Sequence, residues 1–491
     1  MLAADRQMSD TLMIPAHRFP AFLLPVLVTS CMVVGTNYTA PNAITPDYWH
    51  QAVAKDMNTT HSSLERWWTK FNDPTLNDLI DQALGANRTL AIAYERINEA
   101  RASRGIARSA LFPTATASGS GTQNKVSENI GYSTGGQTYD YWATGVDAGW
   151  EIDFFGGVRR SIEAADATVE GTRELYRDTM VSLLAEVALN YVQIRTLEER
   201  IRIANENIGR QQESVNLTKE RFDAGLAPQL DVSQATTNLS NTKAVVPALR
   251  SARATAVNRL ATLLGRYPGN TEPLLGKSSG IPMPANNASI GIPADLVRAR
   301  PDIRAAEREL AAQTAMIGVA QADLLPRFTL AGTFELQSLG ADSLLQGNSG
   351  NYSFGPAFRW NIFSAGRIKN QIEVEESRTR QAYMAYEQAV LRGVEDVENS
   401  LATLRFEKDR RAALSVAVSS SQETVDLVNQ NYKEGLIDFQ NVLDAERTIA
   451  TNQDSLAESE GVVAAAYVSL FKALGGGTPM PEAKVDANGK S

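Results

Sequence analysis

The feature that most limits the fold of this 491-residue chain is that its sequence repeats itself. Seven residues recur unchanged 210 positions later: Trp150, Gly225, Leu226, Val232, Ala235, Leu264 and Gly265 return as Trp360, Gly435, Leu436, Val442, Ala445, Leu474 and Gly475. Four more, Gly105, Ala107, Leu111 and Pro113, return 213 positions later as Gly318, Ala320, Leu324 and Pro326. A spacing kept over such a length indicates an internal duplication, in which both halves fold from the same elements.

Each half carries the same order of predicted elements. A helix comes first and ends just before "LFP" or "LLP", because proline lacks the N–H group and disfavours helical geometry in the residue before it. Two strands and a long helical hairpin follow. We expect the helices at about 76–110 and 294–323, the strands at about 113–153 and 326–363, and the hairpins at about 158–265 and 367–475.

This order predicts six segments along the chain. They are a signal peptide (1–30), an N-terminal segment that begins at a lipidated cysteine (31–75), a first repeat (76–265), a linker (266–293), a second repeat (294–475) and a C-terminal tail (476–491).

The predicted strands alternate between apolar and polar residues. In "FTLAGTFEL", Phe328, Leu330 and Phe334 share one face, whereas Thr329 and Thr333 share the other. Each strand is long enough to cross a bilayer at a tilt. A soluble sandwich gives the same alternation, but two hairpins separated by very long helices favour a membrane protein of the α+β class.

The long helices are expected at 158–222 and 367–432. At 1.5 Å per residue, each is roughly 100 Å long. Apolar residues step by three and four along both, which predicts a coiled-coil seam. The seam residues are Tyr176, Met180, Leu183, Val187, Tyr191, Ile194, Leu197 and Ile201 in the first helix, and Tyr386, Val390, Val394, Val397, Leu401 and Leu404 in the second.

The same turn is expected at the far end of both hairpins. It is written "FDAGLAPQLDVSQA" from Phe222 and "YKEGLIDFQNVLDA" from Tyr432. Gly225 and Gly435 allow the positive φ that a sharp reversal needs. We expect Asp231 and Asp444 in the first turn of the returning helix, where a carboxylate interacts favourably with the helix dipole.

The N-terminus has the features of an export signal. "FPAFLLPVLVTSC" is a short apolar stretch after His17 and Arg18, and it ends at Cys31, the single cysteine. "LVTSC" resembles a bacterial lipoprotein box, in which the cysteine becomes the acylated first residue. Met32, rather than Asp, follows this cysteine, which implies sorting to the outer membrane.

Composition excludes several classes of function. The net charge of −9 argues against binding nucleic acid. One cysteine and three histidines, all near the N-terminus, leave no metal or cofactor site and no nucleophile–base pair. We therefore expect no enzyme, no catalytic residue, no metal and no cofactor.

Four strands cannot stand alone in a membrane. Lipid offers no hydrogen-bond partners, so each unpaired N–H or C=O of a sheet edge costs several kcal/mol. Single-chain barrels begin at about eight strands. Several copies of the chain must therefore pool their strands, although the pattern does not fix the number of copies.

Several motifs resemble those of the outer-membrane factor family, and most closely its lipoprotein branch, which serves resistance-nodulation-division efflux pumps. They are "WEIDFFGGVRR", "RPDIRAAERELAAQTAMIGVAQADLLPRFTLAG", "FDAGLAPQLDV", "YKEGLIDFQNVLDAER" and "LFKALGGG". The resemblance covers about residues 31–477. It implies a homotrimer with a twelve-stranded transmembrane β-barrel, continued by a periplasmic α-helical coiled-coil barrel with an equatorial belt.

The resemblance also implies roles for residues at the hairpin tips. Asp444 matches an acidic ring at the narrowest point of the closed tube, and Asn441 gives a second, neutral ring. Asp231 and Tyr432 match a latch that links neighbouring hairpins. The family's basic partner in the latch is replaced by Ile437, with Lys433 as a candidate substitute. The pairs Gly225-Leu226 and Gly435-Leu436 match the grooves that accept an adaptor protein.

The function implied is an outer-membrane channel of a tripartite efflux pump, which exports small molecules. Its partners would be sister subunits, a periplasmic adaptor protein, an inner-membrane pump and, through acylation of Cys31, membrane lipid. Two alternatives stay open: an exit duct for type I protein secretion, and a periplasmic scaffold lipoprotein without a pore.

Overall fold

The computed structural model of the protein describes residues 33–41, 49, 64–129, 136–276, 280–284 and 299–477. The chain divides into two compact units. The first contains 1–37, 107–162 and 315–375, and the second contains 38–106, 163–314 and 376–491. Each unit therefore draws segments from both halves of the sequence.

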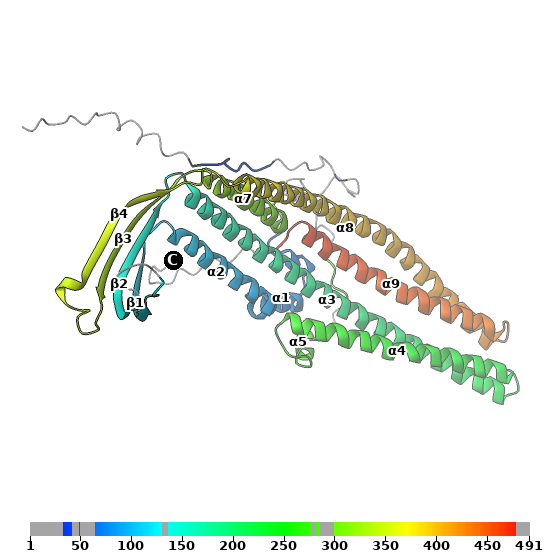
Figure 1. Cartoon of the computed structure of the whole chain (residues 1–491). Coiled ribbons are helices and arrows are strands. Elements are labelled where there is room, and N and C mark those ends of the chain that lie inside the picture. Colours follow the sequence, from blue (N-terminus) through cyan, green and yellow to red (C-terminus); the bar gives the residue numbers. More distant parts are fainter. Residues whose placement is uncertain are drawn as a thin grey trace, which may run out of the picture. The chain divides into compact units, whose positions relative to one another are not determined.

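The first unit holds a four-stranded antiparallel sheet with the strand order β1-β2-β3-β4 (Figure 1). The strands are β1 (Thr114–Lys125), β2 (Thr138–Ile152), β3 (Arg327–Ser338) and β4 (Gly350–Arg359). The short helix η4 (Gly347–Ser349) precedes β4. The two expected hairpins form one sheet, since β2 pairs with β3. Its outer strands are β1 and β4, each with a single neighbour among the described strands.

One face of the sheet is apolar and uncovered. Trp150 lies opposite Leu330, and Phe328 lies opposite Phe358, so their side chains share a face. The side chains of Phe354 and Phe358 are 82% and 69% exposed in the single chain. Exposed apolar faces of this extent mark surfaces that meet lipid or another chain.

Two tryptophans tie the sheet to the segments that lead into it. The indole Nε1 of Trp150 donates to the carbonyl of Leu111 at 2.9 Å, and that of Trp360 donates to the carbonyl of Leu324 at 2.9 Å. These pairs are the same residues at the repeat offsets of 210 and 213. Strand β4 ends at Arg359, just before Trp360. The second pair of strands therefore ends earlier than residue 363, the predicted limit.

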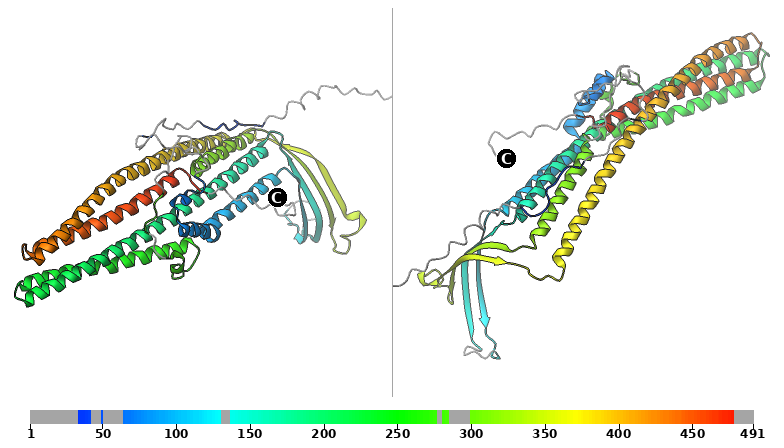
Figure 2. Two further views of the ribbon diagram at one scale, coloured as in Figure 1. Left: turned by 180° about the vertical axis from the view of Figure 1, so that it is seen from behind. Right: turned by 90° about the horizontal axis from the view of Figure 1, so that it is seen from above.

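Four long helices form two hairpins. α3 (Gly157–Asp223) and α8 (Arg367–Lys433) have 67 residues each, which is roughly 100 Å. α4 (Gln229–Leu263) and α9 (Phe439–Ala473) have 35 residues each and return along them. Figure 2 shows the α3/α4 and α8/α9 hairpins side by side. Among the described residues, no helix combines the length and apolar character needed to cross a membrane.

The main core of the second unit packs the predicted seams against short N-terminal elements. Seam residues of α3 and α8 share one buried cluster with Trp67 and Phe71 of η3 (Trp67–Phe71) and with Phe471 of α9. The ring of Trp67 stacks on that of Phe471, with centroids 5.2 Å apart and planes 14° from parallel. One seam residue was wrong: Ile201 is half-exposed, and Ile203 is buried in its place.

The first expected helix is in fact two. α1 (Pro74–Ala86) and α2 (Arg88–Ser109) are separated by Asn87, whose backbone is extended. The Asn87 side chain accepts a hydrogen bond from the Leu90 amide at 2.9 Å, which caps α2. Its amide group donates to the carbonyl of Leu263 at 2.8 Å. These two hydrogen bonds of the Asn87 side chain, rather than a proline or glycine, interrupt the helix.

The matching helix of the second half also starts later than expected. α7 (Pro301–Ala322) begins at a proline, and Ala299 and Arg300 are not helical. Proline suits the first helical position, where no N–H is needed, but it disfavours helix in the residue before it. Residues 294–298 lie outside the described part. A short helix, α5 (Glu272–Leu275), occupies part of the linker.

Replacing Asn87 should destabilise the second unit. Asn87→Ala removes the cap of α2 and leaves the buried Leu263 carbonyl without its donor, which should cost about 1–3 kcal/mol. The thermal unfolding midpoint of the purified protein in detergent measures this. Asn258→Ala, at an exposed position of α4, is the control and should change little. Equal unfolding midpoints for the two variants would contradict this structural role of Asn87.

Candidate functional site

The two hairpin tips have the same local geometry. Gly225 and Gly435 have φ angles of 73° and 76°, as predicted from the sequence. The amide of Leu226 donates to the carbonyl of Arg221 at 2.8 Å, and the amide of Leu436 donates to that of Asn431 at 2.9 Å. The side chains of Leu226 and Leu436 are both 68% exposed. Each tip therefore ends in a projecting apolar side chain.

The structure brings Tyr432 and Asp231 together. The hydroxyl of Tyr432, at the end of α8, donates to the Asp231 carboxylate in the first turn of α4 at 3.4 Å. Tyr432 is buried, and its ring packs against Phe439 with centroids 5.4 Å apart. Burial and the nearby Asp231 raise the pKa of the Tyr432 hydroxyl, so it stays a donor. This contact joins the two hairpins of one chain.

Arg221 completes this contact, and the sequence interpretation missed it. The guanidinium carbon of Arg221 lies 4.9 Å from the centre of the Tyr432 ring. Its Nη1 donates to the carbonyls of Tyr432 and Lys433 at 3.0 and 3.1 Å. Lys433, the predicted basic substitute, is exposed. At the offset of 210, Arg221 and Phe222 correspond to Asn431 and Tyr432, so the first tip carries the arginine and the second carries the tyrosine.

Asn441 and Asp444 are exposed on α9 and do not take part in the Tyr432 contact through any hydrogen bond of the described residues. The prediction that Asp444 lies in the first turn of α9 is wrong. The helix begins at Phe439, so Asp444 lies in the second turn, where Gln440 donates to it at 3.0 Å. Asp438 instead occupies the N-cap position, and the residue 210 positions after Asp231 is Asn441 rather than Asp444.

A second buried contact between the hairpins centres on Glu446, which sequence analysis did not single out. Glu446 of α9 is 5% exposed. Its carboxylate accepts hydrogen bonds from the Ser214 hydroxyl of α3 and, at 3.1 Å, from the Asn238 side chain of α4. Burial raises the pKa of Glu446, against the opposing effects of these donors and of Arg210. The sequence signal is weak, since a single Glu in a helix is usually solvated.

Further polar contacts continue along α3 and α9. Arg200 binds Asp454 through two hydrogen bonds of 2.7 and 2.8 Å. Asn207 and Arg210 both donate to Gln453, at 3.1 and 3.0 Å. The two hairpins are thus held together by polar groups over several turns rather than by apolar packing alone.

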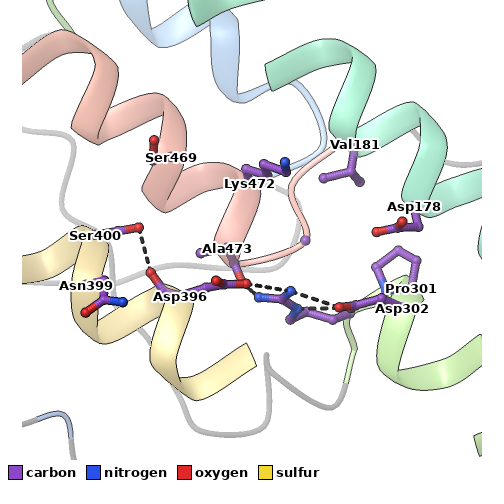
Figure 3. A pocket seen from close by; sticks show the side chains of 12 residues that line it. Asp178, Val181, Pro301, Asp302, Asp396, Asn399, Ser400, Ser469, Lys472 and Ala473 are labelled. Atoms are coloured by element: carbon purple, nitrogen blue, oxygen red, sulfur yellow. Dashed lines mark hydrogen bonds and ion pairs between the residues drawn. The ribbon is translucent and has the colours of Figure 1, made fainter. Parts of the chain in front are cut away.

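A charged cavity of about 240 Å³ lies where α7, α8 and α9 meet α3 (Figure 3). Arg300, from the "RPD" motif, is bound to Asp302 at 2.9 Å and to Asp396 of α8 at 3.0 Å. It also donates to the carbonyl of Ala473 at the end of α9, at 2.9 Å. Burial and the charge of Asp302 raise the pKa of Asp178 on the opposite wall. Arg300 therefore links the start of α7 to the middle of α8 and to the C-terminal end of α9.

Two remaining expectations concern Cys31 and metal sites. Cys31 lies outside the described residues. Within the described ranges, no three His, Cys, Asp or Glu side chains gather closely enough to hold a metal ion.

Arg221 should contribute more to the tip than the Tyr432 hydroxyl. Arg221→Met removes two hydrogen bonds from a charged donor and the contact with the ring, worth roughly 2–4 kcal/mol together. Tyr432→Phe removes one long hydrogen bond, worth at most about 1 kcal/mol. Amide hydrogen exchange of residues 433–439 should therefore accelerate much more in the first variant. Equal or greater exchange in Tyr432→Phe would contradict this ranking.

Comparison with known proteins identifies relatives over nearly the whole chain. Nodulation protein T of Rhizobium leguminosarum bv. trifolii is 33% identical and covers 94% of this chain and 98% of its own length. The antibiotic efflux pump outer membrane protein ArpC of Pseudomonas putida is 31% identical, covering 93% and 95%.

Solved structures agree with this. The outer-membrane channel OprN is 34% identical, with a TM-score of 0.84 over 90% of this chain and 99% of its own. The open state of the Neisseria gonorrhoeae MtrE outer membrane channel is 27% identical, with a TM-score of 0.74 over 91% and 98%. The profile of outer membrane efflux proteins matches residues 79–266 and 292–476. The family expected from the motifs is thereby confirmed, and the chain belongs to the outer membrane efflux proteins, which are located in the bacterial outer membrane.

Proposed function

We propose that this protein is the outer-membrane channel of a tripartite efflux pump and works as a homotrimer. The observation that carries the proposal is the sheet, whose apolar face is exposed and whose outer strands β1 and β4 each pair on one side only within the described part of the chain. In lipid, an unpaired sheet edge is untenable. Pairing β1 of one chain with β4 of the next satisfies both edges, and three copies of the four strands then make a twelve-stranded barrel.

The helices would continue this barrel into the periplasm as a tube. Their roughly 100 Å length and the equal lengths of α3 and α8, and of α4 and α9, support both the tube and the internal duplication. The buried cluster around Trp67 and Phe471 supports an equatorial belt built from the residues before Leu76, from 266–293 and from those after Gly475. The six-segment division of the chain follows from the same scheme.

The tips would form the gate and the docking site. Asp231 and Tyr432 hold the hairpins together, while Asp444 and Asn441, both exposed on α9, would face the lumen as one charged and one neutral ring. A ring of carboxylates attracts cations and repels anions. Gly225-Leu226 and Gly435-Leu436, with their projecting leucines, would receive the helical hairpins of a periplasmic adaptor, which links the channel to an inner-membrane pump.

The protein would be a passive duct and not an enzyme. Acylation of Cys31 would anchor the chain to the outer membrane, in the manner of the lipoprotein branch of the family. Relatives named for antibiotic and toluene efflux support small molecules as the cargo.

Loosening the tip should open the channel. Asp231→Ala removes the acceptor of the Tyr432 hydroxyl, so conductance of the purified protein in planar bilayers should rise several-fold over that of the parent. Glu213→Gln, at an exposed position of α3, is the control and should leave conductance unchanged. A protein that purifies as a monomer, or that never conducts, would favour the scaffold alternative.

Deletion of the gene separates the two kinds of cargo. For a small-molecule pump, the deletion strain should become several-fold more sensitive to toxic compounds and should secrete its proteins normally. The minimum inhibitory concentrations and the secreted proteins of both strains measure this. Loss of a secreted polypeptide with unchanged sensitivity would support type I secretion instead.

A further inference from the structure

Glu446 is a buried ionisable group to which the proposed gate assigns no role. It lies two residues after Asp444 on α9, but Asp444 is exposed whereas Glu446 is 5% exposed. The two side chains therefore occupy different faces of the helix. Asp444 is available to a lumen, and Glu446 is enclosed between the two hairpins.

One carboxyl group joins three helices. One Glu446 oxygen accepts from the Ser214 hydroxyl of α3, and the other accepts from the Asn238 amide of α4 at 3.1 Å. Ser214 and Asn238 are themselves buried, at 9% and 4% exposure. Moving the α8/α9 hairpin away from the α3/α4 hairpin would break both bonds and expose the carboxyl to water.

The surroundings of this carboxyl are mostly neutral. On α3, the charged group whose field acts on Glu446 is Arg210, which donates its own hydrogen bonds to Asn207, Gln422 and Gln453. On α4 the facing group is the neutral Asn238, and Arg447 of α9 reaches the cluster only by donating to Asn238 at 3.2 Å. Among the described residues, no ion pair of Glu446 compensates the burial of its charge.

We propose that Glu446 is a proton-dependent latch of the tip, which holds the α8/α9 hairpin against the α3/α4 hairpin more firmly when protonated than when ionised. The proposal rests on the channel function proposed above. It adds a residue that controls gating and a condition, pH, that changes the gate.

The direction of the effect follows from burial. Enclosure between the hairpins raises the pKa of Glu446 in the closed tip. Separation of the hairpins would return the carboxyl to water and its pKa to the ordinary range. The closed state therefore binds the proton more tightly than the open state, so acid favours closure. As pH rises through the raised value, the ionised carboxylate destabilises the closed tip and opening becomes easier.

Glu446→Gln tests the latch, because glutamine has the same shape, stays neutral and can still bond Ser214 and Asn238. Conductance of the purified full chain in planar bilayers should rise about threefold or more in the parent between about pH 5 and about pH 8. In Glu446→Gln it should stay near the low-pH level of the parent, with less than about a third of that rise. Glu213→Gln, one residue before Ser214 and exposed, should titrate like the parent.

Ser214→Ala supplies a second readout that does not alter the titrating group. It removes one donor to the ionised carboxylate and leaves the Asn238 bond. Without this donor the pKa of the closed state is raised further, so the conductance of this variant should keep rising to higher pH and reach a higher level than that of the parent.

The possible outcomes separate the latch from the channel function. Conduction by the parent and by Asp231→Ala, combined with a Glu446→Gln profile equal to that of the parent, overturns the latch but not the channel. A variant Glu446→Gln that opens more readily than the parent also overturns it. Absence of conduction in the parent, in Asp231→Ala and in Ser214→Ala overturns the proposed function.

Discussion

The hydrogen-bonding demand of the backbone at β1 and β4 is the constraint on which the proposed assembly depends. Among the described strands, each outer strand pairs on one side only, and apolar side chains such as Phe354 and Phe358 are exposed in the single chain. In the proposed assembly, sister chains would supply both matching edges and a continuous apolar surface.

The interface between the two hairpins buries both apolar and polar side chains. Midway along α3 and α8, their seams bury apolar residues around Trp67 and Phe471. Toward the tips, Arg200, Asn207, Arg210 and Glu446 bind their partners through hydrogen bonds. An apolar cluster that includes Val215, Leu239 and Phe439 is also buried there, so the tips combine both kinds of contact.

Much of the fold follows from local patterns. The prolines after Leu111 and Leu324, the alternation in β3 and the glycines at 225 and 435 each act through the backbone of their own neighbourhood. In other places, a distant contact decided the structure. The Asn87 side chain breaks a helix because the Leu263 carbonyl is available to it. Arg221 and Glu446 were missed because their roles depend on α8 and on α3 and α4, far away in sequence.

The amino-acid sequence by itself determined the duplication, the order of elements, the positions of the tips and the family, since all of these are encoded by periodicity and by residues at fixed spacing. Only the tertiary structure decided that β2 pairs with β3, that Arg221 binds the end of α8, and that Glu446, rather than its exposed neighbour Asp444, is enclosed between the hairpins. The physical reason is that burial and partners belong to pairs of segments, and a pattern read along one segment carries no information about the segment that will face it.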